Sequence, residues 1–131
     1  MTAFIVDTGI YAGHSEFTGR VLPGANFVSD TNGTNDCHGH GTHVSGTVAG
    51  TTWGVAKAAK LVPVRVLDCT GNGSWSQVIA GLDYVASSTA RPAVANLSLG
   101  GAASSTLDAA VAGAVSKGVT VVVAAGNSNV D

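Results

Sequence analysis

Apolar stretches alternate along this chain with segments in which apolar residues recur at helical spacing. Pro63 lies within the third stretch, residues 60–67. Proline has no backbone N–H, which indicates a strand at the edge of a sheet or one with a bulge. Polar residues interrupt the second stretch, which makes it the weakest. The five stretches predict buried strands at residues 2–6, 21–27, 60–67, 93–97 and 119–125.

Three segments between these strands predict amphipathic helices. The first covers residues 40–50 and has small residues between its apolar positions. The second runs from a cap at Ser76 to about residue 87. The third is capped by Ser105 or Thr106 and ends at Lys117. A hydroxyl side chain is expected at each cap because it can accept a hydrogen bond from an N–H of the first turn.

Nearly continuous apolar strands that alternate with helices are typical of a parallel sheet buried on both faces. We therefore expect an α/β fold with helices on both faces of a parallel sheet, formed by residues 1–131 as one domain or part of one. Sites in such sheets lie at the carboxyl ends of the strands. Asp7, Ser98, Asn127 and the turn at Gly71 follow strands, so we expect them to share that edge.

The composition excludes other classes of protein. Hydrophobic residues make up 45% of the 131 residues and charged residues 11%, which excludes a disordered chain. A net charge of −2 argues against a nucleic-acid partner. No apolar run approaches the roughly 18 residues that a membrane helix needs, and no signal-peptide pattern follows Met1. Apolar strands close to both ends indicate a piece of a larger protein.

Asp7 follows three apolar residues at the end of the first predicted strand. A carboxylate in this place either forms a turn or a cap, or lies buried and orients a catalytic base. The Asp-Thr-Gly sequence at residues 7–9 also marks aspartic proteases. Those proteins need two such motifs, or a dimer, on an all-β fold. The motif occurs once in this alternating chain, so we set that interpretation aside.

His40 stands between two glycines at the start of the first predicted helix. Glycines permit close approach of the backbone, so the imidazole can be exposed at the helix start, where a neutral ring suits a general base. A zinc site is the alternative, because nearby residues are also ligand types: Cys37, His38 and His43. Four ligands within seven residues would converge only with distortion, so we expect no metal site.

Ser98 and Asn127 each have an ordinary interpretation beside a catalytic one. Ser98 lies in Asn-Leu-Ser-Leu-Gly, which approaches the Gly-x-Ser-x-Gly pattern of a nucleophile but lacks its first glycine. We interpret Ser98 as part of a backbone edge and not as a nucleophile. Asn127 either forms a turn or supplies an amide that donates to an oxyanion.

Three blocks stand in order along the chain: residues 5–9 (Ile-Val-Asp-Thr-Gly), 40–46 (His-Gly-Thr-His-Val-Ser-Gly) and 124–127 (Ala-Ala-Gly-Asn). Together they resemble the subtilisin-like serine proteases (subtilases), and within them the proteinase K branch with its aqualysin-like secreted enzymes. Further segments at 54–57, 64–68 and 97–101 are also similar to the family, so the resemblance covers essentially the whole chain. In this order, the three blocks resemble the family's catalytic Asp, catalytic His and oxyanion Asn blocks.

The resemblance implies a role for each candidate residue. Asp7 would hold His40 in its tautomer, and His40 would carry a proton from a serine to the leaving amine. Asn127 would donate to the oxyanion. The substrate would be an extended peptide or protein, with an apolar side chain under Trp75. The residues that would bind it are Gly71, Asn72, Gly73, Trp75, Ser98, Leu99, Gly100, Ala124, Ala125 and Gly126.

The resemblance also bears on the compartment and on cofactors. The residues alone leave open whether Cys37 and Cys69 are free thiols or one disulfide; they fall where aqualysin-type enzymes are bridged, which implies a disulfide. A secreted protein is implied, monomeric when complete, with no nucleic-acid or membrane partner. No cofactor is assigned to this chain, although calcium is expected in the full-length family enzyme. Four residues could hold calcium but are expected to be solvated: Asp30, Asn32, Asn35 and Asp36.

The chain departs from the family in one essential respect. The family's nucleophile lies in a Gly-Thr-Ser-Met-Ala block, which this sequence does not contain, and none of Ser45, Ser98 or Ser128 matches it. We therefore expect residues 1–131 to be a partial catalytic domain that lacks the half with the nucleophile and is inactive alone. Two alternatives are a non-catalytic peptide-binding module and a half-domain that needs a Ser-bearing partner chain.

Overall fold

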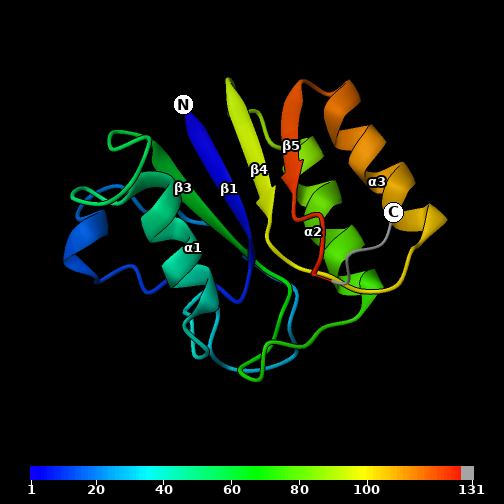
Figure 1. Cartoon of the computed structure of the whole chain (residues 1–131), viewed down its shortest axis with the longest axis horizontal. Helices are drawn as coiled ribbons and strands as arrows, with labels where there is room; N and C mark the ends of the chain where they lie inside the picture. Colours follow the sequence, from blue (N-terminus) through cyan, green and yellow to red (C-terminus); the bar gives the residue numbers. More distant parts are fainter. Residues whose placement is uncertain (128–131) are drawn as a thin grey trace.

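A sheet of five parallel strands forms the centre of the computed structural model, which describes residues 1–127 (Figure 1). The strand order is β2-β3-β1-β4-β5. The predicted parallel sheet is confirmed, and every strand except β2 agrees with its predicted bounds within two residues. The strands are β1 (Thr2–Asp7), β2 (Ala25–Asn26), β3 (Lys60–Arg65), β4 (Ala93–Leu97) and β5 (Val119–Val123).

The first strand of the chain lies at the centre of the sheet. β1 pairs with β3 from Thr2 opposite Lys60 to Asp7 opposite Arg65, and with β4 along its first four residues. Strands on both sides and helices on both faces explain why residues 3–6 of β1 are all buried. The carboxyl end of β1 therefore opens between the loops that follow β3 and β4.

Helices cover both faces of the sheet, as predicted (Figure 1). α1 (His40–Ala49) and the short 3-10 helix η1 (Ser15–Phe17), which was not predicted, lie on one face. α2 (Trp75–Ser87) and α3 (Ser105–Ser116) pack against each other on the opposite face. Alternate residues of β1 point to opposite faces, so that the buried core divides into two clusters.

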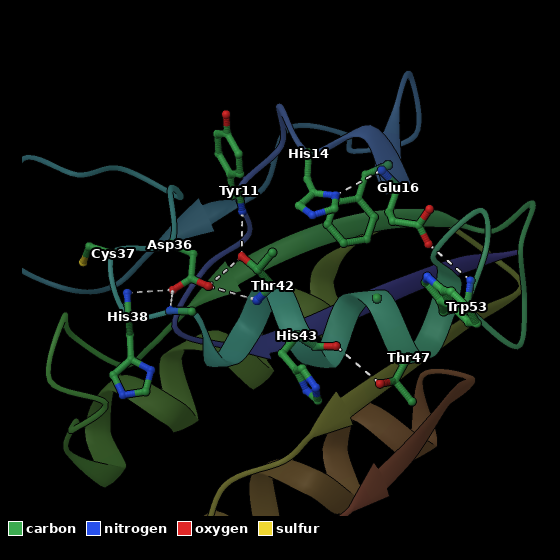
Figure 2. Close-up of a pocket in the computed structure, with 13 residues that line it drawn as sticks. Tyr11, His14, Glu16, Asp36, Cys37, His38, Thr42, His43, Thr47 and Trp53 are labelled. Atoms are coloured by element: carbon green, nitrogen blue, oxygen red, sulfur yellow. Dashed lines mark hydrogen bonds between the residues drawn. The ribbon is translucent and has the colours of Figure 1, made fainter.

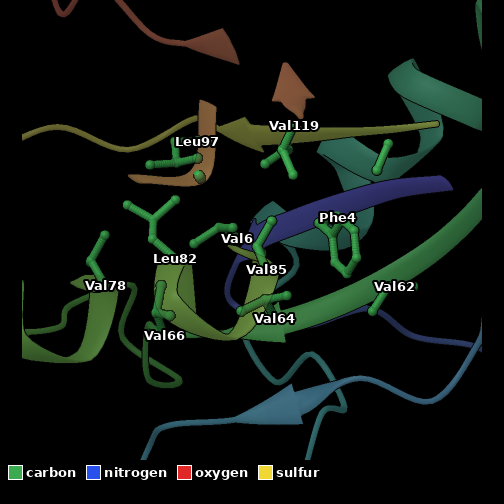
Figure 3. Close-up of a cluster of buried hydrophobic side chains, with 13 residues drawn as sticks. Phe4, Val6, Val62, Val64, Val66, Val78, Leu82, Val85, Leu97 and Val119 are labelled. Atoms are coloured by element: carbon green, nitrogen blue, oxygen red, sulfur yellow. The ribbon is translucent and has the colours of Figure 1, made fainter. Parts of the chain in front are cut away.

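The larger cluster lies between the sheet and α2 (Figure 3). Leu82 and Val85 of α2 meet Phe4 and Val6 of β1 and the valines of β3. Gly81 permits this approach: a Cβ there would lie 2.7 Å from a methyl carbon of Val66. The small residue in α2 thus brings the helix close to the strands that carry the site.

The caps of α2 and α3 lie before the predicted positions. Ser74, not Ser76, caps α2: its hydroxyl accepts from the N–H of Gln77, and the Gln77 side chain accepts from the N–H of Ser74 at 2.7 Å. This reciprocal pair is a capping box, which satisfies two donors of the helix start at once. Ser104 caps α3, one or two residues before the predicted cap.

Pro63 lies at neither an edge nor a bulge, contrary to expectation. β3 is an interior strand, and its register with β1 runs unbroken past Pro63. On the other side of β3, Leu61 pairs with residues 20–22, and Arg65 accepts from Phe27. Pro63 lies between these two points and has no N–H to donate. Because this donor is missing, the pairing of residues 20–27 with β3 is interrupted beside Pro63, and β2 is reduced to Ala25–Asn26.

β5 is the least covered strand. Thr120 and Val122 are exposed, and Val122 keeps 52% of its surface accessible. Both residues stand opposite positions of β4 that lie on the α1 side, which α1 does not extend to cover. Cover of the sheet is therefore incomplete at β5. Within residues 1–127, no helix is both long and apolar enough to cross a membrane.

Candidate active site

Asp7 and His40 form a hydrogen-bonded pair at the carboxyl end of β1. His40 Nδ1 lies 2.8 Å from Asp7 Oδ1, and the same oxygen accepts from the N–H of Thr8 at 2.7 Å. The Asp7 side chain is 0% exposed, whereas that of His40 is 43% exposed. A buried carboxylate against Nδ1 favours the tautomer with its proton there. Nε2 is then the ring nitrogen that can exchange a proton at the surface.

Two glycines bring the start of α1 against the end of β1. Gly39 precedes α1 with φ of 112°, a left-handed conformation that turns the loop into the helix. Gly41 packs against the turn after β1, and a Cβ there would lie 2.2 Å from the carbonyl oxygen of Gly9. Any larger residue at position 41 would push His40 away from Asp7.

A hollow of about 290 Å³ lies beside His40, between the loop after β3 and the loop after β4. We call it the cleft. His38 also lines it and was not among the predicted substrate-binding residues. Six of the predicted substrate-binding residues line the cleft with His40, and they are Gly71, Asn72, Gly73, Ser98, Leu99 and Gly100.

A second hollow, of about 510 Å³, adjoins the cleft and shares Leu99 and Gly100 with it. Trp75 lies at its wall, where Gly101 permits close contact: a Cβ there would lie 2.6 Å from the indole ring. This position fits the predicted apolar pocket, and the binding of a substrate side chain there stays a prediction. The other predicted residues in this hollow are Ala124, Ala125 and Gly126.

Asn127 does not line the cleft that lies beside His40. It is exposed after the end of β5, and it lines neither the cleft nor the second hollow. Gly126, which precedes it, has φ of 86° and lies at the wall of the second hollow. The oxyanion role of Asn127 stays a prediction.

Neither Ser45 nor Ser98 has the surroundings of a nucleophile. Ser45 is buried inside α1, where its hydroxyl donates to the carbonyl of Gly41 at 2.7 Å. Ser98 lies in the cleft and accepts from the side-chain amide of Asn96 at 2.8 Å. Ser128 lies outside the described residues.

The predicted disulfide is confirmed. Cys37 and Cys69 are bonded, with their Cα atoms 4.9 Å apart. The bond joins the loop before α1 to the loop after β3, and these loops carry His38 and Gly71 on the wall of the cleft. The disulfide therefore ties two parts of the cleft together, and it removes Cys37 from the set of possible metal ligands.

The two carboxylates of the oxygen-rich loop are engaged by donors of the protein itself, which does not favour a calcium site there. Both carboxylate oxygens of Asp30 accept from the guanidinium of Arg65, at 2.6 and 2.7 Å. Both oxygens of Asp36 accept from backbone and hydroxyl donors. Calcium needs six to eight oxygen ligands, and these oxygens are already occupied. The cluster of metal-ligand types found among residues 1–127 consists of Asp30 with the two bridged cysteines, which cannot act as thiolate ligands.

The largest of the hollows described here lies elsewhere (Figure 2). It has a volume of about 680 Å³ and runs along α1 beside η1, with Tyr11, His43 and Trp53 at its wall. Neither Asp7 nor His40 lines it. Its size alone does not make it the catalytic site, because the titratable pair and the predicted binding residues gather at the cleft.

Sequence reasoning missed the residues that hold the Asp7–His40 pair in place. Thr8 Oγ1 accepts from the N–H of Gly41 at 2.8 Å and donates to Asp36 at 2.8 Å. Asp36 was considered only as a calcium ligand. An acidic residue shortly before a helix start was an available signal, but its partners become apparent only when β1 and α1 meet.

The sequence of this chain is similar to those of known proteins along nearly its whole length. The family model described as "Subtilase family" matches residues 4–131. The "Extracellular serine proteinase" of Thermus sp. (strain Rt41A) is 59% identical over 98% of this chain and 32% of its own length. The "Alkaline serine exoprotease A" of Vibrio alginolyticus is 53% identical over 100% of this chain and 24% of its own length.

A solved structure agrees with these sequence relatives. A cold adapted subtilisin-like serine proteinase superposes with a TM-score of 0.94 and 52% identity, over 98% of this chain and 47% of that one. The chain thus spans a third or less of the length of the two curated relatives and about half of the solved chain.

Proposed function

The chain belongs to the subtilase family, and we propose that it is part of the catalytic domain of a secreted serine endopeptidase. The Asp7–His40 pair beside the cleft is the observation that carries this proposal. Since the chain spans only part of its relatives' length, the activity is assigned to a longer parent protein that contains this segment. Secretion is proposed because a close relative is named an extracellular proteinase.

His40 would act as the general base and then the general acid. Its Nε2 would take the proton of the serine hydroxyl as the serine oxygen attacks the peptide carbonyl, and would return that proton to the leaving amine. Asp7 would stabilise the imidazolium formed in between, since its buried carboxylate already faces Nδ1. Water would then release the acyl group by the same proton transfers in reverse. Asn127 would donate its amide to the oxyanion.

The cleft would hold the substrate as an extended peptide. The loops at residues 71–73 and 98–100 flank it on two sides. Their backbone groups would pair with the peptide as neighbouring strands do, which gives affinity without selecting side chains. Selection would come from the adjoining apolar hollow, where Trp75 and residues 124–126 would meet substrate side chains.

This chain alone is proposed to be inactive. Its sequence contains no Gly-Thr-Ser-Met-Ala block, and Ser45 is buried. We place the nucleophile in the remaining part of the parent protein. Removal of a nucleophilic serine lowers turnover on the order of 10⁶-fold, a magnitude established for subtilisin itself.

The parent protein and the 131-residue chain are compared in hydrolysis of a chromogenic peptide. We expect hydrolysis by the parent and none by the chain. His40→Ala in the parent should lower kcat by at least 10⁴-fold, on the order known for such residues. His43→Ala is the matched control. His43 is exposed one turn along α1 and lines the large hollow beside η1, not the cleft, so kcat should not change.

Each contrary outcome has a separate meaning. Hydrolysis by the chain alone that depends on His40 would contradict the assignment of the nucleophile to the rest of the parent. Saturable peptide binding without hydrolysis, in parent and chain alike, would favour a peptide-binding module. Activity that returns when the chain is mixed with a separate Ser-bearing chain would favour a half-domain.

A further inference from the structure

Asp36 joins three segments of the chain at one carboxylate. Its Oδ1 accepts from the hydroxyl of Thr8 at 2.8 Å and from the N–H groups of His38 and Gly39 at 3.0 and 2.8 Å. Its Oδ2 accepts from the N–H and the hydroxyl of Thr42 at 2.9 and 2.6 Å. Figure 2 shows Asp36 against the first turn of α1, with these bonds to His38 and Thr42. Five donors thus converge on one side chain.

These bonds replace a helix cap that the sequence does not provide. Gly39 precedes α1 and has no side chain to accept from the first turn. The first N–H groups of a helix lack partners within it, and they attract a negative charge. Asp36 reaches them from outside the cap position and accepts from the N–H of Thr42 within the first turn. The start of α1, where His40 lies, is therefore held by Asp36.

The same carboxylate also reaches the end of β1. The hydroxyl of Thr8 that donates to Asp36 accepts in turn from the N–H of Gly41, next to His40. The N–H of Thr8 donates to the Asp7 oxygen that faces His40. Asp36 is thus connected to both partners of the Asp7–His40 pair, to Asp7 through Thr8 and to His40 through the first turn of α1.

The charge of Asp36 is maintained at neutral pH. Burial by itself would raise the pKa of this carboxyl. The hydrogen bonds from Gly39, Thr42 and Thr8 outweigh burial and hold the pKa below its ordinary value of 3.8. An ionised carboxylate accepts at both oxygens, which the five observed donors require.

We propose that Asp36 is a positioning residue for the Asp7–His40 pair: its carboxylate locks the first turn of α1 to the end of β1 and thereby sets the hydrogen bond from His40 to Asp7. This inference rests on the proposed function of the pair. It assigns Asp36 no contact with substrate. A displacement of about 1 Å at a reacting group can lower turnover about 100-fold, so a residue in this place has a large effect on catalysis.

Glu16 provides a matched control within the same fold. Its carboxylate accepts from the N–H and hydroxyl of Thr52, at 2.9 and 2.7 Å, and from the N–H of Trp53 at 3.2 Å. It therefore holds a loop just beyond the carboxyl end of α1, much as Asp36 holds the amino end. Among the described residues, none of its hydrogen bonds leads to Asp7, Thr8 or His40.

The test compares Asp36→Asn with Glu16→Gln in the parent protein. The first readout is the exchange with water of the His40 Nδ1–H proton, followed by NMR. We expect Asp36→Asn to accelerate this exchange at least tenfold and Glu16→Gln to leave it unchanged. The second readout is peptide hydrolysis, where Asp36→Asn should lower kcat on the order of 10–100-fold with KM within twofold. If Asp36 only stabilised the fold, a folded Asp36→Asn variant would show unchanged proton exchange at His40 and unchanged kcat.

Unchanged proton exchange and unchanged kcat in folded Asp36→Asn would overturn the inference. If Asp36→Asn does not fold, Thr8→Val decides, because it removes only the hydroxyl between Asp36 and Gly41 and keeps the side chain's shape. A protected His40 proton in Thr8→Val would then overturn the inference. If the wild-type parent hydrolyses no peptide, the proposed function fails, and the proton exchange still decides whether Asp36 positions the pair.

Discussion

Arg65 is a charged residue with 0% exposure at the end of β3. Its guanidinium donates two hydrogen bonds to Asp30 and a weaker one to the carbonyl of Gly33 at 3.3 Å. A buried cation is costly unless it is paired, so Asp30 is required as its counterion. The residue that the sequence suggested as a calcium ligand thus holds the loop before α1 onto the sheet by an ion pair.

The ion pair predicts a loss of stability in acid. The hydrogen bond from Arg65 holds the pKa of Asp30 well below its ordinary value of 3.8. A lowered pKa contributes stability that is present above the ordinary value and is lost as the pH falls toward the folded-state value. The unfolding free energy should therefore decline below about pH 4. Asp30→Asn should reduce this decline and lower stability at pH 7, measured by urea unfolding at pH 7 and pH 3.

The control for this measurement is Asp83→Asn, since Asp83 is an exposed residue of α2. It changes the net charge by the same amount without touching Arg65. Part of the decline should persist in Asp30→Asn, because hydrogen bonds also lower the pKa values of Asp68 and Asp36. An equal decline in wild type and Asp30→Asn would contradict the role of the ion pair.

At the scale of elements, the contact between α1 and the end of β1 depends on a glycine. Glycine in a helix costs about 1 kcal/mol relative to alanine, so propensity alone favours its replacement. Gly41 is nevertheless required, because a Cβ would lie 2.2 Å from the carbonyl oxygen of Gly9 and 3.1 Å from the hydroxyl of Thr8. Gly46, in the same helix, has no atom within 4 Å of such a Cβ.

Alanine substitutions at these two positions should have opposite effects. Gly41→Ala should destabilise the chain by about 1–3 kcal/mol, because the helix must move from β1 to relieve the overlap. Gly46→Ala should stabilise it by up to about 1 kcal/mol through helix propensity. Urea unfolding followed by circular dichroism measures both. No loss of stability in Gly41→Ala would show that the contact at Gly9 does not limit position 41, and a loss in Gly46→Ala would contradict the expected gain in helix propensity.

At the scale of the whole molecule, the disulfide closes a loop between two regions that line the cleft. Cys37 and Cys69 are separated by 32 residues in sequence, and the loop between them contains all of α1 and β3. Closing a loop of this length restricts the unfolded chain more than it restricts the folded one. The bond thus stabilises the part of the molecule that carries His40.

Removal of the disulfide should lower the unfolding free energy by roughly 3–4 kcal/mol, on the chain-entropy model for a loop of this length. The double variant Cys37→Ser/Cys69→Ser is compared with wild type by urea unfolding, in the presence and absence of a thiol reductant. Reductant should destabilise wild type and leave the double variant unchanged. Equal stability of oxidised and reduced wild type would contradict the expectation.

Comparison of particular elements explains which predictions succeeded. β1 was predicted within one residue because its apolar run is short, partly β-branched and followed by a turn sequence, which together favour a buried strand. The cap of α2 was placed two residues too late, although Gln77, three residues after Ser74, is the signal of a capping box. The gap in β2 was not predictable, because it depends on Pro63 in a different strand.

Only part of the candidate site could be predicted from the sequence. The types of residue at the strand ends could be identified from their local pattern, and the resemblance to subtilases attached roles to Asp7, His40 and Asn127. The parts played by Thr8, Asp36 and Arg65 could not, since each depends on a partner far away in the chain: Thr8 bonds to Asp36, 28 residues on, and Arg65 pairs with Asp30, 35 residues before it. An oxygen-rich loop has the same composition whether it binds calcium, water or an arginine.

Local pattern was therefore sufficient for the order of strands and helices, the α/β class and the bounds of every strand except β2 to within two residues. Those properties follow from the spacing of apolar side chains, which acts over a few residues. Which residues meet at the site depended on packing. The order of strands places β1 between β3 and β4, and the glycines of α1 let it approach β1. Hydrogen bonds, which form only over a narrow range of distances, then join Asp7 to His40 and connect Asp36 to this pair through Thr8, because only the folded chain brings these atoms within reach.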